Sequence, residues 1–273
     1  DDFHVFLDIF SMLFLPLFLL FYSAVDSLAE SPSSTPNTHP SWDEVSALLR
    51  FLLMLSFNNR LHVQHYLPDI FHIIALLAGT GSTFVRTSVY GIVVNVVQSL
   101  CTTMATSEAS LRSLTLLLSR ASEPKFRIQF GIGHVATNAF ILPDAMDDKS
   151  DKISLGSAAH IVSFLLDVSA AAAPSPHVAA QWTERLTSLV VSTAFRPNPP
   201  IQARALVALG CIAAHSARHD ELLETKVLSL LGNVLSDFHV DDDMELVNAA
   251  LMCLAQMVIR MPAYVQKKYF FLN

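Results

Sequence analysis

The sequence predicts an all-α fold in which helices stack side by side as an α-solenoid. Apolar residues recur at helical spacing from Val45 to Met257, and no stretch alternates between apolar and polar residues as a strand would. Short turns rich in Gly, Pro and Asp separate these apolar runs. The apolar pattern also repeats at a fixed distance along the chain, which is typical of repeat proteins.

The repeat is visible in three sets of apolar residues with the same 0, 4, 8, 11 spacing. They are Val85, Val89, Val93 and Val96; Ile201, Ala205, Leu209 and Ile212; and Leu246, Ala250, Leu254 and Met257. The last two sets lie 45 residues apart, the length of one HEAT or armadillo unit. The first two lie 116 residues apart, so we expect an interruption, located at the loop 143–153. Such units stack because none buries its apolar face alone, and we expect a right-handed superhelix.

Helices are expected in order at 42–57, 66–78, 83–104, 108–120, 154–172, 177–194, 200–217, 221–236 and 242–260. Ser41 and Glu44 predict a capping box at the start of the first. The turns "GTGS", "RPNPP" and "DFHVDDD" separate later helices. The irregular stretch 121–153 predicts a short helix and then a mobile loop. Residues 42–273 therefore form the expected solenoid.

Composition excludes several classes of protein. The chain of 273 residues is 52% hydrophobic and only 15% charged, which is enough apolar material for a large core. A formal charge of −7 offers no basic stripe for phosphates, so no nucleic-acid partner is expected. The same acidic balance argues against broad docking to anionic lipid. The three cysteines, Cys101, Cys211 and Cys253, are far apart and odd in number, which predicts reduced thiols in the core and a cytoplasmic location.

No pattern predicts a catalytic, cofactor-binding or metal-binding residue. "AGTGS" at 78–82 lacks the third Gly and the Lys of a phosphate loop and is expected to be a turn between helices. Asp241–Asp243 lack the Gly and distal Glu of a calcium loop and are expected to cap a helix. No "GxSxG" motif is present.

Two further groups of polar residues have a structural explanation. His62, His65 and His72 are close in sequence but have no Cys or acid at zinc-ligand spacing. His65 and His72 share a helix face only if that helix starts early, so partial burial with a hydrogen bond is expected. Lys267 and Lys268 are expected to lie on a solenoid helix rather than at a lipid surface.

The N-terminal segment, residues 1–26, is hydrophobic, and its status is open. Residues 9–25 contain 17 consecutive uncharged residues, about 25 Å as a helix against about 30 Å of hydrocarbon. Residues 1–41 contain five acids and no Lys or Arg, which disfavours a signal peptide, and Pro16 interrupts the run. Residues 27–41, including "SPSSTPNTHPS", predict a Pro/Ser-rich linker.

Several longer words in the sequence resemble neurofibromin, the large Ras GTPase-activating protein, and its fungal relatives. They begin with "WDE", "LMLSFNN" and "LP" followed by "FH" between residues 42 and 72, and continue with "GIVVNVVQSLC" at 91–101. Then follow "PKFRIQFGI" at 124–132, "QWTE" at 181–184 and "NPPIQARALVALGCI" at 198–212. The resemblance covers at least residues 42–212, and these words belong to the HEAT-like region that follows the GAP and Sec14/PH-like domains.

The resemblance implies a non-catalytic scaffold or interaction region of a negative regulator of Ras. The arginine-finger segment is absent, and Arg50 in "LLRFLL" is expected to be a helix-surface residue. Protein partners are expected, a homodimer among them, with Ras bound only through the absent GAP domain and membrane association at most peripheral. The alternatives are an unrelated HEAT-repeat scaffold of the transport-receptor or phosphatase type, and a solenoid anchored in a membrane by its N-terminal run.

The resemblance leaves two interpretations of the hydrophobic run at residues 6–23. It is either an upstream solenoid helix or a segment absent from the mature protein, such as a translated intron or a wrongly joined gene model. The apolar surface, the central Pro16 and the loss of resemblance favour the second interpretation. We therefore expect residues 1–16 to be spliced from the transcript.

Overall fold

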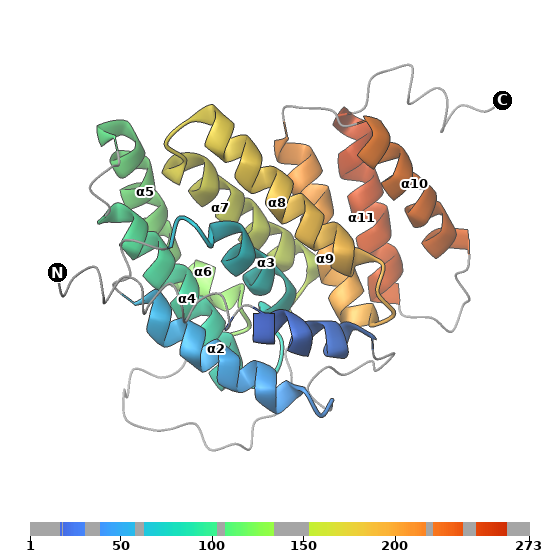
Figure 1. The fold of residues 1–273 in the computed structure, drawn as a ribbon, viewed down its shortest axis with the longest axis horizontal. Coiled ribbons are helices and arrows are strands. Elements are labelled where there is room, and N and C mark those ends of the chain that lie inside the picture. Colours follow the sequence, from blue (N-terminus) through green and yellow to red (C-terminus); the bar gives the residue numbers. More distant parts are fainter. Residues whose placement is uncertain are drawn as a thin grey trace.

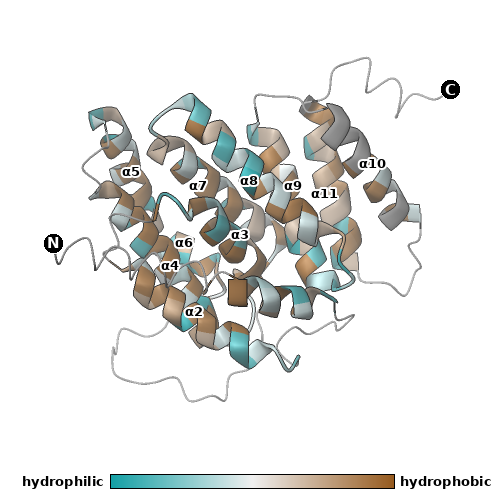
Figure 2. Cartoon of the chain, in the orientation of Figure 1, coloured by the Kyte–Doolittle hydropathy of each residue, from teal (hydrophilic) through white to brown (hydrophobic). Residues whose placement is uncertain are grey.

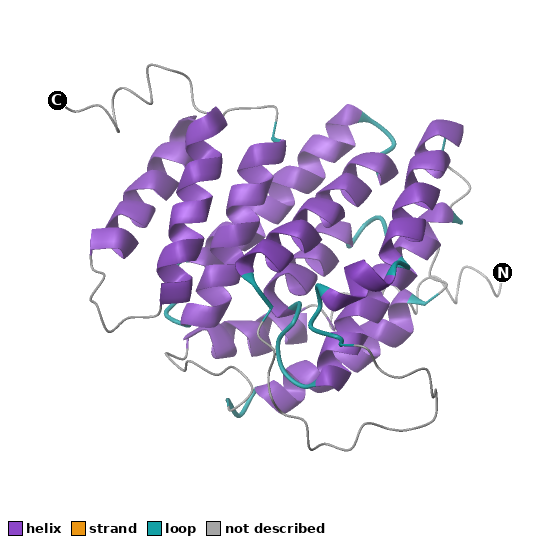
Figure 3. Ribbon diagram, turned by 180° about the vertical axis from the view of Figure 1, so that it is seen from behind, coloured by secondary structure: helices purple, strands orange, loops and turns teal. Residues whose placement is uncertain are grey.

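The fold is known from a computed structural model that describes residues 17, 19–30, 39–57, 63–102, 107–133, 153–216, 221–236 and 244–260. Every regular element in this part of the chain is a helix (Figure 3). The helices are α2 (Trp42–Ser56), α3 (Leu67–Leu77), α4 (Thr83–Cys101), α5 (Glu108–Ala121), α6 (Pro124–Ile128), α7 (Leu155–Ala172), α8 (Pro176–Ala194), α9 (Pro199–His215), α10 (Glu221–Ser236) and α11 (Met244–Arg260). Residues 19–30 form a further helix, called here the N-terminal helix. The predicted all-α solenoid is confirmed.

The helices pack in two layers, and some helices in contact, such as α3 and α8, are distant in sequence. α5, α7, α9 and α11 follow each other in one row, and α3 and α8 pack across it (Figure 1). At one end, α2 packs on α4, and α4 packs on α5. Helices α9 and α11, which carry the apolar sets 45 residues apart, lie in direct contact, as expected of consecutive repeats.

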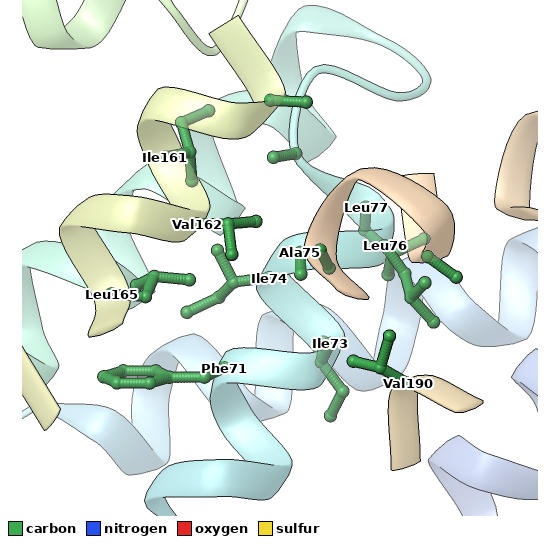
Figure 4. Packing of buried hydrophobic residues seen from close by; sticks show 14 of the residues in the cluster. Phe71, Ile73, Ile74, Ala75, Leu76, Leu77, Ile161, Val162, Leu165 and Val190 are labelled. Atoms are coloured by element: carbon green, nitrogen blue, oxygen red, sulfur yellow. The ribbon is translucent and has the colours of Figure 1, made fainter. Parts of the chain in front are cut away.

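The core is centred on α3 and α9. Every residue of α3 is buried, and so is the whole stretch from Ile201 to Ile212 in α9. Figure 4 shows Ile74 of α3 facing Val162 and Leu165 of α7, and Ile73 near Val190 of α8. A helix that is apolar on all sides is stable only inside a larger array, and the neighbours of α3 and α9 supply that array.

Most helices start close to where they were expected, because the residues that determine a helix start lie next to it in sequence. Serine N-caps begin α4, α5, α7 and α8, and each serine hydroxyl accepts a hydrogen bond from a backbone N–H in the first turn of its helix. These serines are Ser82, Ser107, Ser154 and Ser175. The "AGTGS" stretch is a turn between α3 and α4, where Gly79 and Gly81 have positive φ values of 68° and 74°. A Cβ at Gly81 would overlap the indole of Trp42, so this glycine also permits close packing of α2.

The capping box predicted at α2 is wrong. Ser41 has helical backbone angles, φ −72° and ψ −3°, and its side chain caps no backbone amide. Its hydroxyl instead donates to the hydroxyl of Ser27 in the N-terminal helix, over 3.2 Å. A contact across the fold therefore replaces the local one, because Ser41 lacks the extended backbone that an N-cap needs.

We expected the hydrophobic segment to end at Asp26, but the N-terminal helix continues to Glu30. Phe21, Ala24, Val25, Leu28 and Ala29 are buried in the core. These residues support the interpretation as an upstream solenoid helix. Expectations for residues 1–16, and for the linker between 31 and 38, lie outside the described residues.

The remaining irregular stretch contains the expected short helix, α6, between α5 and α7. Phe126 of α6 packs 4.5 Å from Phe164 of α7 and 5.4 Å from Phe130, measured between ring centroids. The loop expected at 143–153 lies outside the described residues except for Ile153, which is buried against Gly79.

The contact between α9 and α11 generates the first prediction. A Cβ built at Gly210 in α9 lies 3.0 Å from Cα of Cys253 in α11, whereas one at Gly232 in α10 meets nothing within 4 Å. Gly210→Ala should therefore lower the free energy of unfolding by about 1–3 kcal/mol despite the higher helix propensity of Ala. Gly232→Ala should raise it by about 0.5–1 kcal/mol. Denaturant unfolding of both variants measures this difference in sign, and a gain at Gly210 would show that α11 can move away.

Candidate functional site

A group of hydrogen-bonded polar side chains joins the N-terminal helix, α3 and α8. We call it the polar junction, and its members are Tyr22, Asp69, His72, Arg185 and Thr193. One carboxylate oxygen of Asp69 accepts hydrogen bonds from the Tyr22 hydroxyl at 2.9 Å and from the Arg185 guanidinium at 3.0 Å. Arg185 is partly exposed while Asp69 is almost covered. The buried carboxylate is thus compensated by two donors, as burial of a charge requires.

His72 lies at the inner end of this junction and is 1% exposed. Its Nε2 pairs with the Thr193 hydroxyl at 3.2 Å, and its ring stacks on Tyr22 with centroids 5.9 Å apart. Burial, with a smaller effect of the positive Arg185, lowers the pKa of His72 to about 3. The imidazole is therefore neutral at pH 7.

The junction fits a structural role better than a catalytic one. Burial and the negative charge of Asp69 raise the pKa of Tyr22 far above its usual range, so its phenol stays a hydrogen-bond donor. A reacting group needs access to substrate, and His72 and Asp69 lie beneath other side chains. Among the described residues, no three His, Cys, Asp or Glu side chains are placed to hold a metal ion.

Asn198, in the turn between α8 and α9, forms a second polar contact with the N-terminal helix. Its side-chain amide donates to the carbonyl of Leu28 at 3.1 Å, and its backbone N–H donates to that of Ala29 at 3.0 Å. Its side-chain oxygen accepts from the N–H of Ile201 at 3.2 Å and so caps α9. This one fully buried residue thus satisfies carbonyls at the end of the N-terminal helix and an N–H group at the start of α9.

Two buried arginines bind loop carbonyls. The guanidinium of Arg204 in α9 donates to the carbonyls of Leu76 and Ala78, where α3 ends, and burial lowers its pKa to about 10. Arg86 in α4 donates to the carbonyls of Gly81 and Gly131, both at 2.8 Å. These contacts supply donors to carbonyls at a helix end and in turns.

The residues singled out from the sequence do not gather at one site. His65 is exposed in the turn before α3, whereas His72 is buried, and His62 lies outside the described residues. Cys211 and Cys253 are buried free thiols, as predicted, while Cys101 is half-buried. Asp241–Asp243, Lys267 and Lys268 also lie outside the described residues.

Arg50 is exposed on α2, as expected, and its guanidinium lies 4.6 Å from the ring centroid of Phe84. The same surface exposes Phe51, Met54 and Phe57, with Met54 72% exposed. Figure 2 shows these turns of α2 as hydrophobic. Exposed aromatic and Met side chains beside an arginine are typical of protein–protein interfaces.

Two described helices, Thr83–Cys101 and Leu155–Ala172, are long and apolar enough to cross a membrane by length and composition alone. Buried core helices meet the same criteria. Here α4 packs between α2 and α5, and α7 packs between α5 and α9. Their apolar character is explained by helix packing.

The fold and its buried contacts define a helical-repeat array held together by polar contacts at helix ends. The chain is similar to two longer yeast proteins. It is 25% identical over 206 residues to inhibitory regulator protein IRA1 of Saccharomyces cerevisiae, which covers 74% of this chain and 6% of that protein. It is also 25% identical over 170 residues to inhibitory regulator protein IRA2, covering 62% of this chain and 5% of that protein. Comparison with models of protein families finds no match.

These similarities support a distant relation to the yeast inhibitory regulators. The chain spans 5–6% of the length of these relatives. The similarity covers much of the helical array and identifies no functional residue.

Sequence reasoning missed the polar junction, Asn198 and the buried arginines. A signal existed for Arg204, which is a charge in the middle of an otherwise apolar helix. Asn198 precedes two prolines, a pattern typical of a helix start. No local pattern links Asp69 with Arg185, which lie 116 residues apart.

The buried imidazole predicts a pH dependence of stability. The unfolded chain titrates His72 near pH 6.5, and the folded chain only near pH 3, so the unfolded state binds more protons between these values. This contribution to stability is fully present above about pH 6.5 and falls by up to about 1.4 kcal/mol per pH unit below it. His72→Gln should flatten the slope of unfolding free energy between pH 4 and 6. Gln98→Ala, which replaces an exposed residue without a titrating group, should leave it unchanged, and equal slopes in all three proteins would contradict the buried neutral state.

The hydrogen bonds of Asn198 to the N-terminal helix and to α9 predict that Asn198→Ala lowers the free energy of unfolding by about 2–4 kcal/mol. The substitution removes the cap of α9 and leaves the buried carbonyl of Leu28 without its donor. The exposed Gln98→Ala on α4 is the control and should change stability by less than about 0.5 kcal/mol. Chemical denaturation measures both, and equal stabilities would mean that the N-terminal helix is not held at this point.

Proposed function

We propose that this chain is a non-catalytic scaffold and interaction region of a neurofibromin-like Ras GTPase-activating protein, a negative regulator of Ras signalling. The observation that carries the proposal is the similarity to the yeast inhibitory regulator IRA1 over 206 residues. The words that resemble neurofibromin lie within the same helical array. Under this proposal the activating domain lies outside the chain.

The placement of those words supports a structural role. "WDE" begins with Trp42, which packs on Gly81, and "NPPIQARAL" contains Asn198 and Arg204. "PKFRIQFGI" contains Gly131, whose carbonyl accepts from Arg86. These residues fix helices against one another, which is what a scaffold requires of its sequence.

The exposed surface of α2 is where we place partner binding. Phe51, Met54 and Phe57 offer apolar contact area, and Arg50, held against Phe84, offers a charge for an acidic group. We expect protein partners there, a second copy of the protein among them. Ras would be bound only through the GAP domain, in the cytoplasm, with membrane contact at most peripheral.

The non-catalytic role predicts that the chain, added in excess to GTP-loaded Ras, leaves the rate of GTP hydrolysis unchanged. Catalysis of this kind uses an arginine that reaches the transferred phosphoryl group, and Arg50 lies against an aromatic ring. A single-turnover phosphate-release assay measures the rate. Stimulation that is lost in Arg50→Ala would overturn the proposal, and Arg112→Ala on α5 is the matched exposed control.

The proposal also predicts what precedes the chain in its gene. A GAP domain encoded upstream in the same reading frame is expected. A complete upstream sequence without one would favour an unrelated HEAT-repeat scaffold.

A further inference from the structure

The exposed side of α2 carries charged, small and apolar residues in a fixed order. The positions lie 4, 3, 4 and 3 residues apart, so they share one side of the helix, and the last directly follows it. All five are exposed, and we call them the outer stripe of α2: Asp43, Ala47, Arg50, Met54 and Phe57. The stripe begins with a negative charge, continues with a small residue and a positive charge, and ends with two apolar residues.

No described part of the chain covers the outer stripe. α4 packs on the opposite side of α2, where the apolar residues of α2 are buried. The N-terminal helix, which precedes α2, lies on α3, where its Tyr22 donates to Asp69. Met54 and Phe57 are therefore 72% and 67% exposed. Large apolar side chains beside an arginine are typical of a surface that binds another protein.

A second copy of α2 matches the stripe poorly. In a parallel pair, Arg50 would face Arg50 and Asp43 would face Asp43, and like charges repel. In an antiparallel pair that joins Arg50 to Asp43, Met54 and Phe57 would lie opposite positions 39 and 36. Both positions precede the start of α2 at Trp42, so the apolar half of the stripe would extend beyond the helix of the second copy. The occupant that covers the whole stripe is therefore a different helix.

We propose that the outer stripe of α2 binds an amphipathic helix of a partner protein, which runs antiparallel to α2. Such a helix has apolar residues at i and i+3, an acidic residue at i+7, a small residue at i+10 and a basic residue at i+14. The apolar pair covers Phe57 and Met54. The acid pairs with Arg50, and the base pairs with Asp43. The antiparallel direction places the base near the C-terminal end of the partner helix, where the helix dipole favours a positive charge.

The size of the stripe sets the expected affinity. From Asp43 to Phe57 it is about 21 Å long and one helix wide, which offers less than the roughly 800 Å² per partner of a stable complex. The contact therefore fits a weak, reversible complex with a dissociation constant in the micromolar range. The inference rests on the proposed function, which places partner binding on this surface.

Binding of a synthetic helix to the whole chain tests the proposal. The probe is a fluorescent peptide of about 20 residues with the spacing given above, and its control has the acid and the base exchanged. We expect the probe to bind at least about tenfold more tightly than the exchanged peptide, because the exchange turns two attractive pairs into repulsive ones. Met54→Glu should abolish binding, whereas Thr115→Glu, at an exposed position of α5, should leave it unchanged. Fluorescence anisotropy measures the dissociation constants.

Crosslinking in the full polypeptide identifies the natural occupant. A photo-crosslinking amino acid replaces Met54, and in a control it replaces Thr115. We expect position 54 to crosslink to another protein, within a segment that has the spacing given above.

Several results would overturn the proposal. In the binding experiment they are equal affinities of the two peptides, or unchanged binding by Met54→Glu. In the crosslinking experiment they are crosslinks to a second copy, to a distant segment of the same polypeptide or to a segment without the spacing, or a yield equal to that at position 115. None of these results bears on GTP hydrolysis, so they overturn only the inference. Stimulation of Ras in the phosphate-release assay would overturn the proposed function instead.

Discussion

The complete burial of α3 and α9 is the constraint on which the rest of the structure depends. Neither helix has a polar side, so each is stable only when other helices surround it. Burial also removes water from their ends, where helices leave carbonyl and N–H groups without partners. Arg204 supplies donors at the end of α3, and Asn198 supplies the acceptor at the start of α9. The apolar core therefore requires these few polar residues, each in one position.

The same constraint explains the N-terminal helix. Taken alone, its apolar residues suggested a membrane anchor or a segment foreign to the protein. In the fold, Phe21, Val25 and Leu28 complete the core, the hydroxyl of Tyr22 donates to Asp69 of α3, and Asn198 donates to the carbonyl of Leu28. Glu30 at its end also pairs with Arg196 at 3.0 Å. Because its apolar residues are buried and its polar groups pair with other helices, the N-terminal helix is an integral part of the fold.

The helices could be predicted from the sequence because the information is local. Apolar spacing and serine, proline or glycine at the ends predicted 177–194 and 221–236, and the structure has Pro176–Ala194 and Glu221–Ser236. The contacts between helices could not be predicted in this way. Asp69 and Arg185 are 116 residues apart, and Asn198 and Leu28 are 170 apart, so no spacing rule connects them. Ser41 shows the converse, since its local pattern was clear but its helical backbone prevents the cap, and its hydroxyl donates to Ser27 instead.

These distant contacts make the array more cooperative than a simple solenoid. In an ideal repeat protein each unit touches only its neighbours, so stability is a sum of local contributions and one end can unfold alone. Here the N-terminal helix is bound to the turn before α9, and the end of α3 is bound to α9 itself. Opening the N-terminal helix would expose the carbonyls that Asn198 satisfies, and separating α3 from α9 would leave the buried charge of Arg204 without acceptors. The arrangement of α3, α8, α9 and the N-terminal helix is therefore fixed as one unit.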